Sequence, residues 1–278
     1  MPTTLTLGHS PDSDDAFMFY ALAAGKIVTD GLRYEHILKD IQTLNDWAVE
    51  GRLDTTAISV HAYAYVAERY AILNHGASMG EKDYGPLVVA RTAVARERLR
   101  GATIAVPGLK TSAYLALRLA IGEFEPLVMP FDEIMEAVAA GRAEYGLLIH
   151  EGQLTHGECG LAGVLNLGTW WFQETGLPLP LGVNAIRRAL PDAVKSAASQ
   201  QLRESIEYAL QHRAEALAWA LQYARGMQRS VADRFVGMYV NRRTVDLGDD
   251  GRRSIRLFLQ RGAEGGIIPA VQAIDFVM

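Results

Sequence analysis

The chain has 278 residues, enough for one large domain or two of modest size. Hydrophobic residues make up 49% and charged residues 21%, a composition that can bury a core and that differs from disordered or fibrous proteins. A formal net charge of −5 argues against a general nucleic-acid binder and against binding to anionic membranes, because both need a basic surface. We therefore expect a small-molecule ligand.

Three features favour a cytoplasmic location. Cys159 is the one cysteine, so no intrachain disulfide can form, which fits a reducing compartment. Neither Lys nor Arg precedes Lys26, and a secretory signal would need a basic start. The longest charge-free stretch, 159–173, contains three glycines and is too short to span a bilayer.

The first ninety residues alternate strand-like and helix-like segments separated by glycine or turn residues. Ser13 or Asp14 can cap a first helix that ends at Gly25. We predict, in order, a strand at 5–8, this helix, a strand at 32–38, a helix at 43–50, a strand ending near 59, a helix at 62–68 and a strand at 70–73. Such alternation predicts a mainly parallel sheet with helices on both faces.

The pattern restarts near residue 102, which indicates a second lobe. We predict a strand at 102–106, a tight loop at 107–110, a helix at 111–121, a strand at 127–129, a helix capped by Asp132 and running to 140, and a strand at 145–149. Helical spacing or strong helix formers return at 193–223, 231–239 and 252–264.

The two halves share a local signature. Gly51-Arg52-Leu53-Asp54 precedes the strand that ends at Ser59, and Gly141-Arg142-Ala143-Glu144 precedes the strand that leads to His150. In each case glycine can end a helix in a left-handed turn, and the next strand then carries a polar side chain to the rim of its sheet. We expect Ser59 and His150 at analogous rim positions in the two lobes.

Two similar extended segments, 86–91 and 180–187, lie where one half ends and the other begins. They predict two hinge strands, with 1–90 and 186–278 forming lobe one and 91–185 forming lobe two. The expected fold class is α/β, a two-lobed periplasmic-binding-protein-like fold of type II with the substrate cleft between the lobes. Solute-binding proteins and enzymes share that scaffold, so the fold leaves the choice open.

His150 is the strongest candidate for chemistry, because it follows an apolar run at the carboxyl end of a predicted strand, where ligands of open α/β sheets bind. Histidine exchanges a proton near neutral pH, and Glu151 beside it is a weaker candidate. The alternative is a histidine that only forms hydrogen bonds at the lobe interface.

A metal site is not expected. His150, His156 and Cys159 carry possible zinc ligands, but no second cysteine exists and the HExxH spacing is absent. The sequence also lacks GxxxxGK[ST] and GxGxxG, so neither a nucleoside triphosphate nor a dinucleotide cofactor is indicated.

Several helix starts offer polar groups to a ligand. Thr111 and Ser112 begin a helix whose free N–H groups would suit a carboxylate, although a plain N-cap is the simpler interpretation. Asp12, Asp14 and Asp15 precede the first helix, where acids stabilise the helix end or bind ligand hydroxyls. Other candidates are Asn45, as a cap or a donor into the cleft, and Trp170 and Trp171, for ligand stacking or interlobe packing.

The chain resembles the 1,4-dihydroxy-6-naphthoate synthase family of the futalosine route to menaquinone. The likeness lies in Ser10-Pro11 with the segments 17–22, 40–45, 101–114, 148–151 and 175–182. The resemblance implies conversion of cyclic dehypoxanthine futalosine to 1,4-dihydroxy-6-naphthoate with release of a small hydroxyketone fragment. It implies a carbon–carbon lyase without cofactor that acts on a small carboxylate.

Carried across by motif, His150 resembles the family's proton acceptor, and the residues resembling its substrate contacts are Asn45, Ala57, Ile58, Ser59, Thr111 and Ser112. The family often has Cys-Pro-Asn-Asp after Ser-Pro, whereas this chain has Asp12-Ser13-Asp14-Asp15, which keeps the last acid and adds negative charge. Asp15 is therefore included as a substrate contact. Chorismate dehydratase of the same pathway and a non-catalytic solute-binding protein are the alternatives. The oligomeric state is left open, with a homodimer among the options.

Overall fold

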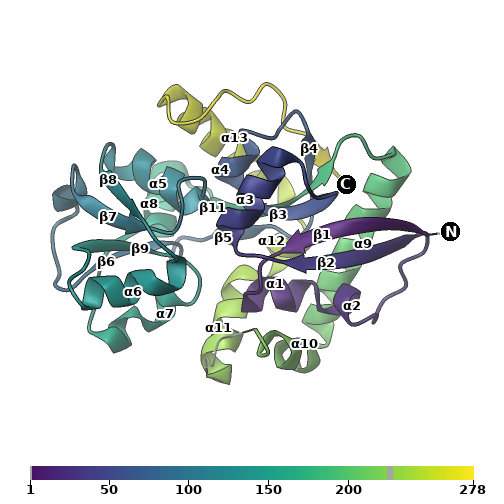
Figure 1. The fold of residues 1–278 in the computed structure, drawn as a ribbon, viewed down its shortest axis with the longest axis horizontal. Coiled ribbons are helices and arrows are strands. Elements are labelled where there is room, and N and C mark those ends of the chain that lie inside the picture. The colour runs from purple at the N-terminus through teal and green to yellow at the C-terminus, as the bar shows by residue number, and fades with distance from the viewer. Residues whose placement is uncertain (1, 224–227) are drawn as a thin grey trace.

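The strands form two sheets, one in each of two lobes that lie side by side, and both chain ends belong to the first lobe (Figure 1). The computed structural model describes residues 2–223 and 228–278. The first sheet has the order β12-β4-β11-β3-β1-β2, with β5 paired to β11. Its strands are β1 (Thr3–His9), β2 (Leu32–Leu38), β3 (Thr55–Ser59), β4 (Tyr70–Leu73), β5 (Ser78–Gly80), β11 (Leu179–Arg187) and β12 (Phe276–Val277).

The second sheet has the order β10-β6-β9-β7-β8. Its strands are β6 (Leu87–Ala90), β7 (Thr103–Val106), β8 (Glu125–Val128), β9 (Tyr145–Leu148) and β10 (Ala162–Asn166). Within it, β7 pairs in parallel with β8 and β9, whereas β6 pairs antiparallel with β9 and β10. In the first sheet β11 pairs antiparallel with β3, β4 and β5. The sheets are therefore mixed rather than mainly parallel, because the strands next to each crossing run against their neighbours.

The strand pairing places both crossings a few residues from the predicted boundaries at 90/91 and 185/186. Segment 87–90 belongs to the second sheet and segment 179–187 to the first, so the chain crosses at 81–86 and at 176–178. The predicted boundaries differ because the residues of a short apolar strand do not by themselves determine which sheet the strand joins.

Helices cover both sheets (Figure 1). The first lobe carries α1 (Ser13–Met18), α2 (Tyr20–Ala23), α3 (Ile41–Glu50), α4 (Val60–Tyr63), α9 (Asp192–Gln211), α10 (Arg213–Ala220), α11 (Arg229–Tyr239), α12 (Arg242–Val245) and α13 (Gly248–Glu264). The second lobe carries η1 (Arg96–Leu99), α5 (Ser112–Ile121), α6 (Phe131–Ala139), α7 (Gly152–Thr155), η2 (His156–Cys159) and α8 (Leu167–Thr175).

Several helices differ from their predictions. The helix predicted at 193–223 is divided into α9 and α10 at His212. The first predicted helix is divided into α1 and α2 at Phe19, and the predicted helix at 62–68 is helical only up to Tyr63. The helix predicted to be capped by Asp132 has Pro130 at its N-cap, and Asp132 lies in its first turn.

The shared glycine signature folds as predicted. Gly51 ends α3 with φ 70°, and Gly141 follows α6 with φ 75°, both in the left-handed region that glycine adopts at little cost. The strand after each glycine leads to the rim of its sheet, where Ser59 ends β3 and His150 follows β9 by two residues.

The largest apolar cluster is continuous between the lobes. It contains Ile58 and Tyr63 of the first lobe together with Leu115 and Tyr145 of the second. Trp171 of α8 is fully buried there, and its indole N–H donates to the Ser254 hydroxyl of α13 at 3.1 Å. Trp171 therefore serves interlobe packing.

Two glycines allow a close backbone approach where the chain first crosses between the lobes. A Cβ on Gly168 would lie 2.0 Å from the carbonyl oxygen of Tyr84, and one on Gly85 would lie 2.6 Å from the backbone nitrogen of Gly168. Only glycine fits at these two positions without moving the backbone.

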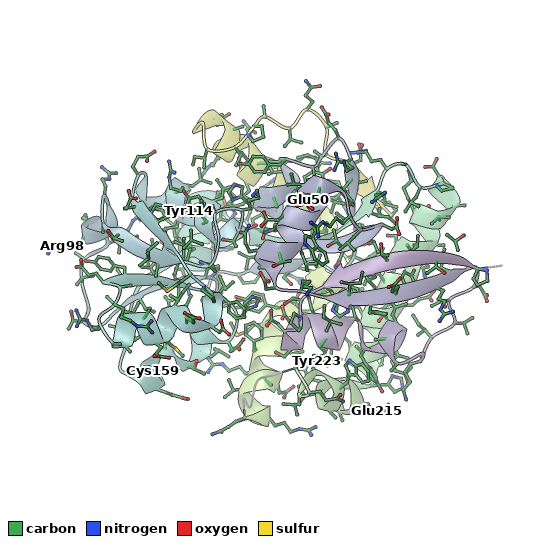
Figure 2. All side chains as sticks on the ribbon, in the orientation of Figure 1. Glu50, Arg98, Tyr114, Cys159, Glu215 and Tyr223 are labelled. Atoms are coloured by element: carbon green, nitrogen blue, oxygen red, sulfur yellow. The ribbon has the colours of Figure 1, made fainter. Side chains whose placement is uncertain are left out.

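In the part of the chain that the structure describes, every helix is too short or too polar to cross a membrane. Cys159 is exposed on the surface of the second lobe (Figure 2).

Candidate functional site

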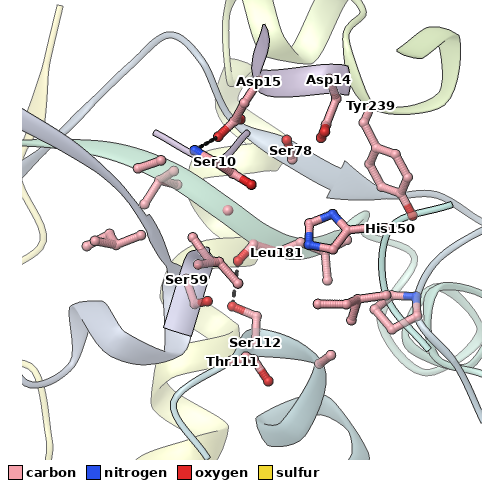
Figure 3. Close-up of a pocket in the computed structure, with 18 of the residues that line it drawn as sticks. Ser10, Asp14, Asp15, Ser59, Ser78, Thr111, Ser112, His150, Leu181 and Tyr239 are labelled. Atoms are coloured by element: carbon pink, nitrogen blue, oxygen red, sulfur yellow. Dashed lines mark hydrogen bonds between the residues drawn. The ribbon is translucent and has the colours of Figure 1, made fainter. Parts of the chain in front are cut away.

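A cavity of about 750 Å³, measured to its open mouth, lies between the lobes. Figure 3 shows many of its lining residues, with His150 between Asp14 and Asp15 of α1 and the start of α5. The lining comes from both lobes and includes Ser10, Asp14, Asp15, Ala57, Ile58, Ser59, Ser78, Thr111, Ser112, His150, Gln153, Leu181, Asn184 and Tyr239. All predicted site residues except Asn45 are therefore brought to one cavity.

His150 has an unusual backbone conformation. Its φ of 52° makes it the only non-glycine residue with positive φ among residues 2–223 and 228–278. This left-handed conformation costs an L-residue about 1–2 kcal/mol, and such residues concentrate at functional sites. The imidazole packs against the Phe131 ring, with the ring centroids 4.8 Å apart.

The structure also gives His150 a partner from the opposite lobe. The imidazole Nε2 lies 3.3 Å from Oδ2 of Asp12, whose side chain is 4% exposed. The Ser10 hydroxyl donates a short hydrogen bond to that same Asp12 carboxylate oxygen. The sequence indicated Asp12 as a helix-end acid, a ligand for hydroxyl groups or a departure from the family pattern, but not as a partner of His150. A contact between residues 138 positions apart depends on how the lobes meet.

The first turn of α1 carries two buried carboxyl groups with raised pKa values. Burial raises the pKa of Asp14 to about 6; the nearby positive charge of His150 opposes this rise and the negative charge of Asp12 adds to it. Burial and the charge of Asp14 raise the pKa of Asp15 well above its usual range, although the Ser10 N–H donates to Asp15 at 2.7 Å. Raised acids beside a histidine in a cleft are typical of active sites.

At the start of α5, the two predicted hydroxyl groups already bind protein atoms. Thr111 caps the helix, because its Oγ1 accepts from the Tyr114 N–H at 3.2 Å and donates to the Gly108 carbonyl at 2.9 Å. The Ser112 hydroxyl donates to the Leu181 carbonyl at 2.6 Å and accepts from the His61 N–H at 3.2 Å. The first-turn N–H groups of Ser112 and Ala113 have no intrahelical partner, so they are the donors that α5 offers to an anion.

Asn45 lies behind the cavity wall rather than in it. Its amide holds Ser59 twice: Asn45 Nδ2 donates to Ser59 Oγ at 3.0 Å, and Ser59 N–H donates to Asn45 Oδ1 at 2.8 Å. The side chain is fully buried. In this arrangement Asn45 fixes the rim residue Ser59 instead of reaching into the cleft itself.

Several polar lining residues were not predicted from the sequence, among them Tyr239, Gln153, Asn184 and Ser78. The Tyr239 hydroxyl of α11 donates to Gln153 Oε1 of α7 at 2.7 Å, across the mouth of the cleft, and burial raises the pKa of Tyr239, so the hydroxyl stays protonated. Asn184 and Ser78 come from β11 and β5. Tyr239 ends an amphipathic helix and the others lie on strands or a short helical turn, so local pattern alone gave no indication of them.

His150, His156 and Cys159 carry the possible zinc ligands of the sequence. Within the described ranges, no three His, Cys, Asp or Glu side chains gather as metal ligands would. His156 is engaged locally, with its Nδ1 3.1 Å from the Gln153 carbonyl oxygen.

A family model described as menaquinone biosynthesis matches residues 5–264. The chain is 42% identical to the 1,4-dihydroxy-6-naphthoate synthase of Thermus thermophilus, over 96% of this chain and 97% of that protein. It is 37% identical to the protein of the same name from Streptomyces coelicolor, over 96% of each chain.

Two solved structures also resemble this chain. A crystal structure of a protein from Archaeoglobus fulgidus superposes with a TM-score of 0.91 at 44% identity, covering 95% of this chain and 98% of that one. The alkanesulfonate-binding protein of Xanthomonas axonopodis superposes with a TM-score of 0.72 at 14% identity, covering 96% and 95% of the two chains. The second likeness shows the fold alone and confirms the predicted two-lobed, periplasmic-binding-protein-like class.

Proposed function

Because this chain belongs to the menaquinone biosynthesis family, we propose that it is a carbon–carbon lyase, which converts cyclic dehypoxanthine futalosine to 1,4-dihydroxy-6-naphthoate and releases a small hydroxyketone fragment. One observation carries the proposal beyond the likeness in sequence. A single cavity between the lobes brings together an imidazole, held at a strained backbone position, and the amide-rich start of a buried helix.

The two groups divide the work. The first-turn N–H groups of α5 receive the ring carboxylate of the substrate, where the positive end of the helix dipole favours an anion. His150 removes a proton from the substrate as general base. The electrons of the broken C–H bond form a ring double bond as the carbon–carbon bond cleaves. The fragment leaves with the carbon–carbon electron pair and takes up the proton held by His150, and the remaining ring system becomes aromatic.

Aromatisation supplies the driving force, so the protein needs to supply a base, an anchor and a site from which water is excluded. The lining supports the last requirement, because Ala57, Ile58, Leu181 and Val183 contribute apolar walls between the polar ends. Asp15, Ser59, Thr111 and Ser112 then act by framing the pocket and holding these elements in place.

The test is incubation of the purified protein with cyclic dehypoxanthine futalosine and, separately, with chorismate, with products followed by absorbance and mass spectrometry. Release of 1,4-dihydroxy-6-naphthoate from the first substrate alone is the expected result. Dehydration of chorismate would instead select the sister enzyme, and tight binding of either compound without any product would select a carrier.

A further inference from the structure

Asp12 and His150 meet across the cleft, one from each lobe. Asp12 precedes α1, which follows β1 of the first sheet, and His150 follows β9 of the second. Their side chains approach to 3.3 Å, and both are largely buried, with exposures of 4% and 16%. The contact therefore exists only when the lobes are together.

The Asp12 carboxylate is itself held in place. The Ser10 hydroxyl donates to it, and the Asp12 backbone carbonyl accepts from the Ala16 N–H at 2.9 Å as the first bond of α1. On the other side, His150 has a fixed left-handed backbone and the Phe131 ring against its imidazole. Two rigid partners thus define one geometry for the imidazole.

A carboxylate oxygen 3.3 Å from Nε2 stabilises a proton on that nitrogen by electrostatic attraction, so it selects the imidazole form that carries hydrogen on Nε2. In the neutral ring, the basic nitrogen is then Nδ1.

We propose that Asp12 is a positioning residue, which orients His150 from the opposite lobe and fixes its Nε2–H form, so that the general base is completed only when the lobes close. The inference rests on the proposed function. It also gives a role to the residue at which this chain departs from the Cys-Pro-Asn-Asp pattern of its family.

The kinetic test compares Asp12→Leu, which cannot accept a hydrogen bond, with Asp12→Asn, which keeps one oxygen acceptor and the side-chain shape. We expect kcat to fall at least ~10-fold in Asp12→Leu and less in Asp12→Asn, with KM changed less than ~3-fold. In an His150→Ala background, neither substitution should lower kcat further, because Asp12 acts through the imidazole. An equal loss in that background, or unchanged kcat in Asp12→Leu, would overturn the proposal.

The matched control is Asp46→Asn. Asp46 of α3 pairs with Lys110 at 2.9 Å, also between the lobes, and neither residue is part of the cavity lining. If Asp12 merely held the lobes together, Asp46→Asn would show the same loss of kcat. A loss confined to the Asp12 variants supports positioning.

A second measurement does not need turnover. In protein labelled with ¹⁵N-histidine, the His150 signals are identified by their absence in His150→Gln, and the Nε2–H form should predominate at pH 8. That population should fall in Asp12→Leu, or in Asp12→Asn if the leucine variant does not fold. A mainly Nδ1–H ring, or a ring unaffected by both changes, would contradict the inference even if the proposed reaction is confirmed. If the wild type releases no naphthoate, only the proposed function fails.

Discussion

His150 combines the proposed catalytic imidazole with a strained backbone conformation. A non-glycine residue with φ of 52° persists only where the surroundings hold it. Here the Phe131 ring of the same lobe and the Asp12 carboxylate of the other lobe contact the imidazole. The sequence identified this histidine from its place after an apolar strand, whereas its strained backbone and its partner depend on tertiary structure.

Replacing His150 by Ala should lower turnover at least ~100-fold, the low end for loss of a general base. The measurement is steady-state release of naphthoate, with circular dichroism to verify folding. Near-normal turnover in a folded variant would show that the imidazole is not the base.

His150→Gly separates the loss of the imidazole from the relief of backbone strain. It also lacks the imidazole and should be as inactive as the alanine variant. Glycine adopts positive φ without strain, so His150→Gly should be about 1 kcal/mol more stable than His150→Ala in urea unfolding. Equal stabilities would indicate that the loop relaxes when the side chain is removed.

The raised pKa of Asp14 predicts how the free energy of unfolding depends on pH. Its pKa is about 6 in the folded protein and near 3.8 when unfolded, so between these values the folded state binds more protons than the unfolded state. The contribution of Asp14 is fully favourable below about pH 4 and is lost as pH rises through 6. The size of the loss is on the order of 3 kcal/mol.

Asp14→Asn, which mimics the protonated acid, should therefore match the wild type near pH 4 and exceed its free energy of unfolding at pH 7 to 8. Urea unfolding across this range measures the difference. The exposed Asp30→Asn serves as the control and should follow the wild-type curve. A destabilised Asp14→Asn at pH 8 would mean that the ionised carboxylate stabilises the fold.

At the scale of elements, α5 joins stability to binding. Thr111→Val removes the N-cap and should cost about 1 kcal/mol of unfolding free energy. It also loosens the helix start that frames the Ser112 and Ala113 amides, so KM should rise more than kcat falls. Thr111→Ser keeps both hydrogen bonds and should stay close to the wild type. A Thr111→Val variant with normal KM would place the carboxylate elsewhere.

The elements best predicted from sequence are those whose boundaries are set by neighbouring residues. β2 and β4 match their predicted bounds, and Thr111 caps α5 as expected, because alternation, glycine and capping hydroxyls act locally. The strands flanking the crossings were assigned to the wrong sheets, since pairing partners are chosen over long range. The position of Asn45 differs from its prediction for a similar reason. Asp40 caps α3, which begins at Ile41, so Asn45 lies inside the helix, and its amide turns to Ser59.

At the scale of the molecule, the glycine contact at the first crossing fixes how the lobes are joined. Gly168→Ala should destabilise the protein by about 2 kcal/mol or more, because its Cβ would meet the Tyr84 carbonyl. Gly157→Ala, where a Cβ meets nothing within 4 Å, should change stability by less than ~1 kcal/mol. Similar values for the two variants in urea unfolding would show that the crossing is not tightly packed.

Site residues from distant elements were beyond sequence analysis at this scale. Gln153 of α7 and Tyr239 of α11 belong to different lobes, and they meet because the lobes pack together. The sequence of neither segment indicates this contact. Asp12 could not be predicted for the same reason, because its partner His150 lies in the other lobe.

The apolar cluster that runs through both lobes has a consequence for cooperativity. Leu115 of the second lobe lies in one buried cluster with Tyr63 and Phe258 of the first. Scanning calorimetry should therefore record one heat-absorption peak, with equal calorimetric and van't Hoff enthalpies, and two resolved peaks would contradict this. Lobe motions that admit the substrate must therefore leave this shared apolar cluster closed to water.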